Sequence, residues 1–348
     1  MTVYIGVDFH ARQQTISYLT TEDGEIQHLV LLHEDARVVR AFYQQFVGQR
    51  VVVGFESSGY AAWFEELLEE LGHEIWIGHA TYIRQFAKRR QKNDRRDADL
   101  ILELLQTGDF PRIHRYSGHT REMLQQLRYR QRLVKMRTMT MNILLFMASS
   151  RGVGMKTQLQ SKRGQAKLAA LALPQLLGSQ RDELLSLLRL LDEKIATIEG
   201  WLEKETAADP AVQRLQTHPG IGLLTSICVR YTLEEASRFT TTRKVAAFAG
   251  FDPMEDQSDE RRSMGPISKQ GSRWLRFYLV EAGQVAMRYD ADLRSVYKRI
   301  ALRRGHAKAK VAVGRRLLVR AFIMLRDEID YAEFQRRGVA ARSSRGSA

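Results

Sequence analysis

Four carboxylates stand where a fold can bring them to one point. Asp8 and Glu56 each end a short apolar run that is typical of a buried strand. Asp94 and Asp97 lie three residues apart, so on a helix they share one face. Each residue alone also fits an ordinary role as a turn residue, a helix cap or an arginine partner. Their combination on two strand ends and one helix face favours a shared site.

Carboxylates that share a site repel one another unless hard cations such as Mg²⁺ neutralise them. Two such ions about 4 Å apart can clamp the attacking and leaving oxygens of an in-line phosphoryl displacement. The quartet of Asp8, Glu56, Asp94 and Asp97 therefore predicts a catalytic site that holds two Mg²⁺ ions and acts on phosphodiester bonds. Asp99 lies five residues beyond Asp94 and is predicted to point elsewhere.

The elements around the quartet predict a mixed α/β domain. Strands are expected at residues 3–8, 14–20, 26–32, 50–56 and 73–77, with helices at 35–48, at 60–71 and within 80–107. This order is typical of a ribonuclease-H-like fold. The domain would place the quartet at the ends of its strands.

The composition favours a polyanionic partner. The chain has 54 Lys and Arg against 40 Asp and Glu, a net charge of +14. Nucleic acid is the commonest such partner, although a ribosomal or membrane-surface protein also fits. The single cysteine, Cys228, excludes an intramolecular disulfide and a four-cysteine zinc site. We expect no signal peptide, no membrane span and a cytoplasmic location, since no long apolar run is present.

Glycines and basic residues at several places predict contacts with nucleic acid. Three basic residues precede the second half of the quartet, two glycines form a helix-hairpin-helix-like turn, and residues 299–320 carry eight Lys and Arg but no acid. A solvated helix face is the alternative interpretation for some of them. The predicted contacts are Lys88, Arg89, Arg90, Gly220, Gly222, Lys269, Arg273, Arg276, Arg303, Arg304, Lys308, Lys310, Arg315 and Arg316.

The middle of the chain, residues 111–208, is predicted to be helical. An apolar seam there steps by four and three residues, as in a coiled coil. A helical hairpin used for self-association and a helix packed inside its own domain both fit this seam, which is about three heptads long. The seam residues are Leu184, Leu188, Leu191, Ile195, Ile198 and Leu202.

The C-terminal part is predicted to be a small helical domain at 209–334 with a disordered tail at 335–348. A polar loop from Met254 to Pro266 has no core-forming pattern, and loops of this length are usually functional or disordered. It holds two serines, Ser258 and Ser263. The domains expected before it are a metal-binding catalytic domain at 1–110 and a helical dimerisation region at 111–208.

Motifs at both ends of the chain resemble those of the insertion sequence 110 family of DEDD transposases. The segments at 4–8, 55–59 and 92–98 are similar to the family's RuvC-like domain. Those at 219–222, 248–253 and 267–271 (Pro-Gly-Ile-Gly, Phe-Ala-Gly-Phe-Asp-Pro and Ile-Ser-Lys-Gln-Gly) are similar to its serine-bearing transposase domain. The resemblance covers about residues 1–330.

This resemblance implies an enzyme of the bacterial or archaeal nucleoid that cuts and rejoins donor and target DNA. It implies that the four carboxylates bind Mg²⁺ and that a serine attacks a DNA phosphate and holds it covalently. By its position in the motif the serine is Ser258, with Ser263 as the alternative. The neighbours Gln257 and Asp259 depart from a family pattern that often has glycine beside this serine.

The resemblance also implies partners. A structured bridge RNA would pair with both DNAs and choose their sequences. Homodimers would assemble into tetramers in which the acidic domain of one protomer meets the serine domain of another, with the 181–205 seam as a dimer contact. Two other functions stay open from the residues: a metal-dependent, junction-resolving nuclease that uses water as nucleophile, and a non-catalytic nucleic-acid-binding protein.

Overall fold

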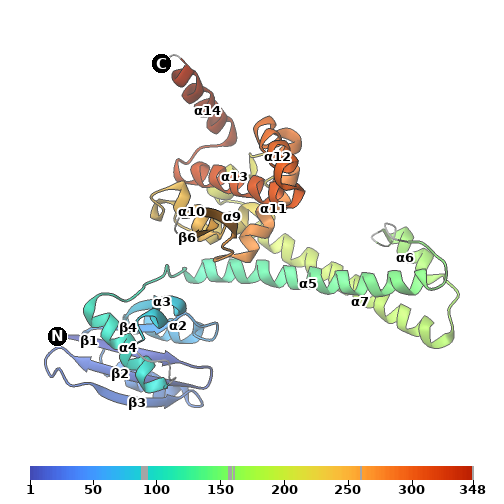
Figure 1. The fold of residues 1–348 in the computed structure, drawn as a ribbon. Helices are drawn as coiled ribbons and strands as arrows, with labels where there is room; N and C mark the ends of the chain where they lie inside the picture. The colour runs from blue at the N-terminus through green and yellow to red at the C-terminus, as the bar shows by residue number, and fades with distance from the viewer. Residues whose placement is uncertain (88–92, 156–158, 160, 259–260, 347–348) are drawn as a thin grey trace. The chain divides into compact units, whose positions relative to one another are not determined.

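The computed structural model describes residues 1–348 except 88–92, 156–158, 160, 259–260 and 347–348. The chain divides into two compact units, Met1–Arg115 and Tyr116–Ala348 (Figure 1). None of the helices in the described part of the chain is long and apolar enough to cross a membrane.

The first unit is a mixed α/β fold on one five-stranded sheet of order β3-β2-β1-β4-β5. β1 is antiparallel to β2 and parallel to β4, β2 is antiparallel to β3, and β4 is parallel to β5. The element order matches the prediction and is consistent with a ribonuclease-H-like fold. The strands are β1 (Thr2–Phe9), β2 (Gln13–Thr20), β3 (Gln27–Leu32), β4 (Arg50–Glu56) and β5 (Glu74–Gly78), and the helices are α1 (Ala36–Gln44), α2 (Ala62–Glu70), α3 (Ala80–Gln85) and α4 (Asp94–Thr107).

The two faces of β1 and β4 have different partners, because successive side chains of a strand point to opposite faces. Odd-numbered residues such as Phe55 share a core with side chains of α1 and α2. Even-numbered Val52 packs instead with Ile101 and Leu105 of α4. Asp8 and Glu56 are even-numbered and lie at the C-terminal ends of these two strands. The alternation therefore places both on the face that α4 covers.

The second unit begins with a long antiparallel pair of helices. α5 (Gly118–Ser149) and α7 (Gln175–Thr206) have 32 residues each, and α6 (Lys162–Ala169) lies between them in the chain. Arg130 pairs with Glu199 and Arg137 with Asp192, so positions rise along one helix as they fall along the other. The predicted helical hairpin is present.

The predicted seam of α7 is buried within this hairpin. Leu188 packs with Leu144 of α5, and Leu191 packs with Leu133. Leu202 at the other end is fully buried in a core shared with the C-terminal helices. The seam therefore packs largely within its own chain, and a dimer contact through this region stays a prediction. Its apolar stripe is covered by the neighbouring helix of the same chain.

The rest of the second unit is helical apart from one hairpin. It has α8 (Pro210–Gln216), α9 (Leu223–Leu233), a 3-10 turn at Ala236–Arg238, α10 (Thr242–Phe248), β6 (Pro253–Ser258), β7 (Arg261–Ile267), α11 (Arg273–Tyr289), α12 (Ala291–Arg304), α13 (His306–Arg326) and α14 (Tyr331–Gly346). α8 and α9 flank the glycines of the predicted helix-hairpin-helix-like turn.

Two predictions for this unit differ from the structure. The segment predicted as a polar loop is an antiparallel hairpin of β6 and β7. Main-chain hydrogen bonds form this ladder, so it needs no apolar alternation. The tail predicted to be disordered from 335 is helical as far as Gly346. Glu333 pairs there with Arg336 and Arg337, one turn further along α14, which supports an isolated helix.

A buried ionic cluster joins α12, α13 and the start of α14. Asp290 caps α12, pairs with Arg320 and accepts a hydrogen bond from the Tyr331 hydroxyl. Burial alone would raise the pKa of Asp290, but the hydrogen bonds from Arg320 and Tyr331 lower it to about 2. Arg320 also pairs with Asp292 at 2.7 Å. Arg320 belongs to the basic tract predicted for phosphate contacts, yet these ion pairs occupy it.

Stability of this unit should depend on pH through His218, which is fully buried with its ring 4.3 Å from that of Tyr331. Burial lowers the pKa of His218 to about 4, so the unfolded chain takes up the proton first. We expect the free energy of unfolding to be highest above pH 6.5 and to fall by about 3 kcal/mol between pH 6.5 and pH 4. The loss from Asp290 comes only below about pH 3.8.

Guanidinium denaturation at pH 7 and pH 4.5 measures this fall. The variant His218→Leu should lack the His218 part of it, so the difference between the two chains isolates this residue. An equal pH dependence in both chains contradicts the account.

Candidate metal centre

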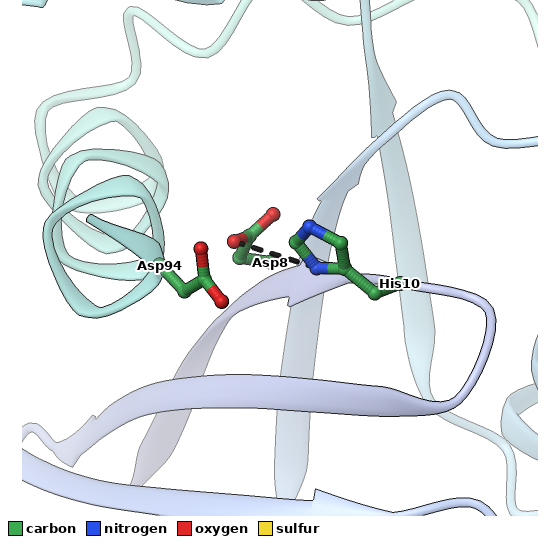
Figure 2. A group of neighbouring side chains, drawn as sticks. All are labelled: Asp8, His10 and Asp94. Atoms are coloured by element: carbon green, nitrogen blue, oxygen red, sulfur yellow. Dashed lines mark ion pairs between the residues drawn. The ribbon is translucent and has the colours of Figure 1, made fainter. Parts of the chain in front are cut away.

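Asp8, His10 and Asp94 gather at the end of β1 (Figure 2). One donor atom from each, a carboxylate oxygen or an imidazole nitrogen, lies within 4.8 Å of the other two. His10 Nδ1 is 3.6 Å from Asp8 Oδ2, and the Asp8 side chain is only 15% exposed. Figure 2 shows Asp94 projecting from the start of α4 toward the strand that carries Asp8.

Backbone contact between β1 and α4 brings Asp94 to Asp8. A Cβ on Gly6 would lie 2.5 Å from the carbonyl oxygen of Ala98 and 2.6 Å from the amide nitrogen of Leu102. Both distances are far shorter than a carbon atom tolerates, so only glycine lets the helix lie this close to the strand. Gly6 is two residues before Asp8 and on the same face of the strand.

Local hydrogen bonds fix the positions of Asp94 and His10. The Asn93 side chain accepts a hydrogen bond from the Arg95 amide, so α4 starts at Asp94. His10 follows β1 in the turn to β2, which its amide closes with a 2.9 Å hydrogen bond to the Gln13 carbonyl. His10 was not among the predicted site residues. Its only signal in the sequence is its place two residues after an acid at a strand end.

Asp99 attaches α4 to β2 and β3. Its Oδ1 accepts a 2.6 Å hydrogen bond from the Ser17 hydroxyl and lies 2.7 Å from His28 Nε2. The Arg95 guanidinium lies 3.1 Å from the other ring nitrogen of His28. The carboxylate stands between serine and histidine, so the histidine cannot take the serine proton as in a hydrolase triad. The cluster positions α4.

The other two members of the predicted quartet lie outside the three-residue cluster, one on β4 and one on α4. Glu56 ends β4, the parallel neighbour of β1, and its carboxylate is 3.6 Å from the Arg84 guanidinium. Asp97 lies in the first turn of α4 with Asp94. Among the described residues, Asp8, His10 and Asp94 are the only group of three or more acidic, histidine or cysteine side chains whose donor atoms lie within 4.8 Å of one another. A four-carboxylate site remains a prediction.

The donor set fits a divalent cation. Carboxylate oxygens are the ligands that Mg²⁺ and Mn²⁺ prefer, and the imidazole of His10 would also suit Fe²⁺. Asp8 and Asp94 would hold the ion, and Glu56 would join them on leaving Arg84. A bound ion of this kind supplies positive charge to the oxygens of a reacting phosphate.

Most of the predicted nucleic-acid contacts that the structure describes are exposed. Lys88, Arg89 and Arg90 lie outside the described residues. Lys310 is partly buried. The exposed ones are Lys269, Arg273, Arg303, Arg304, Lys308, Arg315 and Arg316. Exposure leaves these side chains accessible to phosphate, and their role stays a prediction.

Two residues that were predicted to contact nucleic acid, Arg276 and Gly220, have structural roles in the fold. Arg276 donates hydrogen bonds to the carbonyl oxygens of Ala249 and Gly271. A Cβ on Gly220 would lie 2.5 Å from the Ala286 amide, so this glycine is required by packing against α11. Gly222 is different, because it caps α9 in an exposed position with open space where its side chain would be.

A tight neck holds the hairpin that carries Ser258. A Cβ on Gly250 would lie 2.3 Å from the Gln270 carbonyl oxygen, and one on Gly271 only 2.1 Å from the Phe248 carbonyl oxygen. The two C-terminal glycine motifs of the sequence therefore meet backbone to backbone at the base of β6 and β7.

The neck is closed by hydrogen bonds just below the strands. The Ser268 amide donates to the Asp252 carbonyl at 2.8 Å, and its hydroxyl donates to the Asp252 carboxylate at 2.6 Å. The Lys269 amide donates to the Gly250 carbonyl at 3.2 Å. These bonds fix the base from which the strands extend.

Both units match known transposases. A transposase model of the IS110 DEDD type matches residues 5–147, and the model described as the transposase IS116/IS110/IS902 family matches residues 212–298. Together the two matches cover well over half of the chain. The chain belongs to the IS110 family of transposases. It is therefore a DNA transposase, and its DEDD-type match supports a divalent metal.

Relatives support the same family along most of the transposase. A probable family 20 transposase of Pseudomonas aeruginosa is 27% identical over 76% of this chain and 80% of its own length. The transposase for insertion sequence element IS1111A of Coxiella burnetii is 28% identical over 80% of this chain and 79% of its own length. The transposase for insertion sequence element IS1328 of Yersinia enterocolitica is 28% identical over 68% of this chain and 71% of its own length.

Proposed function

We propose that this transposase cuts and rejoins donor and target DNA by attack of Ser258 on a DNA phosphate at a Mg²⁺ site, with a bridge RNA choosing the DNA sequences. The observation that carries the metal-dependent part is the meeting of Asp8 and Asp94 at the end of β1. Two Mg²⁺ ions held by Asp8, Glu56, Asp94 and Asp97 would neutralise the phosphate that approaches them.

The position of Ser258 in the hairpin supports its choice as nucleophile. Ser258 ends β6 and forms the last pair of the ladder with Arg261. Ser263 pairs with Asp256, further from the tip. A DNA strand can approach a residue beside the tip of the hairpin without contacting the paired part of β6 and β7. The rigid neck at the other end of the hairpin holds the two strands in place. Ser263 is the alternative nucleophile.

The proposed step exchanges one phosphate ester for another. The Ser258 oxygen forms a bond to phosphorus as its proton leaves to a base or to solvent. The bond from phosphorus to one deoxyribose oxygen breaks, and that oxygen departs with the electron pair and takes up a proton. The strand end stays on the protein as a phosphoserine ester. Attack by the hydroxyl of another DNA end reverses the step and rejoins the strands.

Guidance and assembly complete the proposal. A structured bridge RNA would pair with donor and target DNA, which fits a protein with net charge +14. Homodimers that assemble into tetramers would bring the serine of one protomer to the acidic site of another. Extraction of the purified transposase with phenol tests the RNA partner, which should be released as one defined species that ribonuclease destroys.

Covalent trapping tests the nucleophile. The transposase is incubated with labelled DNA carrying its element ends, its RNA and Mg²⁺, and is then denatured. We expect a protein–DNA adduct for the wild-type chain and for Ser263→Ala, and none for Ser258→Ala. Free cut ends in all three chains, with no adduct, would instead favour water as the nucleophile, as in a junction-resolving nuclease.

A further inference from the structure

A groove between α10, α12 and α13 in the second unit is lined by four arginines. It encloses about 370 Å³. This volume is within the range of about 300–1,000 Å³ that is typical of sites for small organic groups. Its walls carry Arg243 from α10, Arg299 from α12, and Arg315 and Arg316 from α13, and its lining includes the apolar side chains of Ile300 and Val319.

The positive charge of this groove is largely uncompensated. Arg316 is 3.7 Å from Asp292, which also pairs with the buried Arg320. Within the described part of the chain, no ion pair involves Arg243, Arg299 or Arg315. Guanidinium groups bind phosphate through paired N–H donors, and three exposed ones around one groove form a strong anion site.

The apolar lining distinguishes this groove from a site for phosphate alone. Val296 is buried, and Ile300 and Val319 are partly buried along the same groove. A duplex cannot place the face of a base against such a concave surface, because its bases are stacked and paired. A single strand can place an unstacked base or sugar on aliphatic side chains while its phosphates meet the arginines.

We propose that this arginine groove binds an unpaired segment of nucleic acid, with about one nucleotide inside and the flanking phosphates on Arg243, Arg299 and Arg315. The proposal rests on the transposase acting on nucleic acid, but not on Ser258 or on the metal. The RNA and the opened DNA of a recombination reaction both present unpaired strands of this kind. α10 lines the groove and leads through the neck to β6, so the groove and the serine hairpin belong to one connected segment.

Binding of short oligomers to the full-length chain in EDTA tests the groove. The probes are fluorescent 15-nucleotide oligothymidylate and oligouridylate, with a duplex of the same length for comparison. The variant Arg243→Gln/Arg299→Gln should weaken binding of at least one single strand by about tenfold or more. The slope of log K against log salt should fall by about 1.4, since a single strand loses about 0.7 for each phosphate contact.

A matched control removes the same number of arginines outside the groove. Arg336→Gln/Arg337→Gln on α14 should leave single-strand binding near the wild-type value. Ile300→Trp, which fills the groove without changing charge, should weaken single-strand binding and leave duplex binding unchanged. Its circular dichroism must match that of the wild-type chain.

Comparing the probes shows whether the groove binds RNA or DNA, and it shows which result would contradict the proposal. Weaker binding of oligouridylate alone by the groove variants assigns the groove to RNA, and weaker binding of oligothymidylate alone assigns it to DNA. Weaker binding of both means that the groove accepts unpaired RNA and unpaired DNA. If the groove variants bind both oligomers as the α14 control does, or if duplex binding falls as much, the groove proposal is wrong. The binding assay in EDTA needs neither Ser258 nor a metal ion, so failure of the proposed nucleophile is seen separately.

Discussion

Replacing Asp8 by asparagine should greatly slow DNA strand cleavage by this transposase while leaving its fold unchanged. Asparagine has nearly the same shape, but it removes the negative charge that lies beside His10 and Asp94. Charge stabilisation by a bound metal is worth several kcal/mol in such sites. Loss of about 3–4 kcal/mol corresponds to a fall in the cleavage rate of about 100- to 1,000-fold. Single-turnover cleavage of labelled element-end DNA measures this.

The control for this prediction is a carboxylate of the same unit outside the site. Asp23→Asn, in the turn after β2, should cleave DNA at the wild-type rate. Asp94→Asn should reproduce the loss seen with Asp8→Asn. Full cleavage activity in either site variant, with a normal melting curve, contradicts the proposed metal centre.

Replacing Gly6 by valine should inactivate the transposase by moving α4 rather than by removing a ligand. The new Cβ would overlap the backbone of the helix at Ala98 and Leu102. Overpacking of this kind costs about 1–3 kcal/mol of stability. A displacement of Asp94 by about 1 Å lowers the rate by about 100-fold.

The measurement pairs unfolding by denaturant with single-turnover cleavage. Gly200→Ala in α7 is the control, because open space surrounds that position and alanine favours a helix. A Gly6→Val chain that folds and cleaves DNA normally would mean that the contact between β1 and α4 does not set the site. Addition of excess Mg²⁺ should not rescue the variant, since geometry and not affinity is lost.

The order of elements in the first unit could be predicted from the sequence. Each strand there either is apolar on both faces or alternates between apolar and polar residues. The sequence placed Asp8 and Asp94 at one site for the same reason, since a strand end and a helix start are recognisable locally. It did not predict His10, because the direction of a side chain in a turn depends on the neighbouring helix. Nor did it predict the partner of Glu56, since Arg84 is a close neighbour only once β4 and α3 are folded.

The second unit was harder to predict from the sequence. The seam of α7 shows that a helix has one apolar stripe, but not whether α5 or another protomer covers it. The two strands of the β6–β7 hairpin are largely polar and lack an apolar alternation, so the sequence carries no pattern that predicts its main-chain ladder. The arginine groove joins Arg243 to Arg299 and Arg315, which are far apart in the chain, and only the packing of α10 on α13 brings them together.

The most direct test of the account's central claim, that Asp8 and Asp94 hold a divalent cation, needs no DNA. Fe²⁺ takes the place of Mg²⁺ in the purified transposase, and ascorbate with peroxide then cuts the backbone next to the bound iron. We predict cuts near residues 8 and 94, suppressed by excess Mg²⁺ and absent from Asp8→Asn. Cuts spread along the chain, or cuts near these residues that persist in Asp8→Asn, would contradict the account.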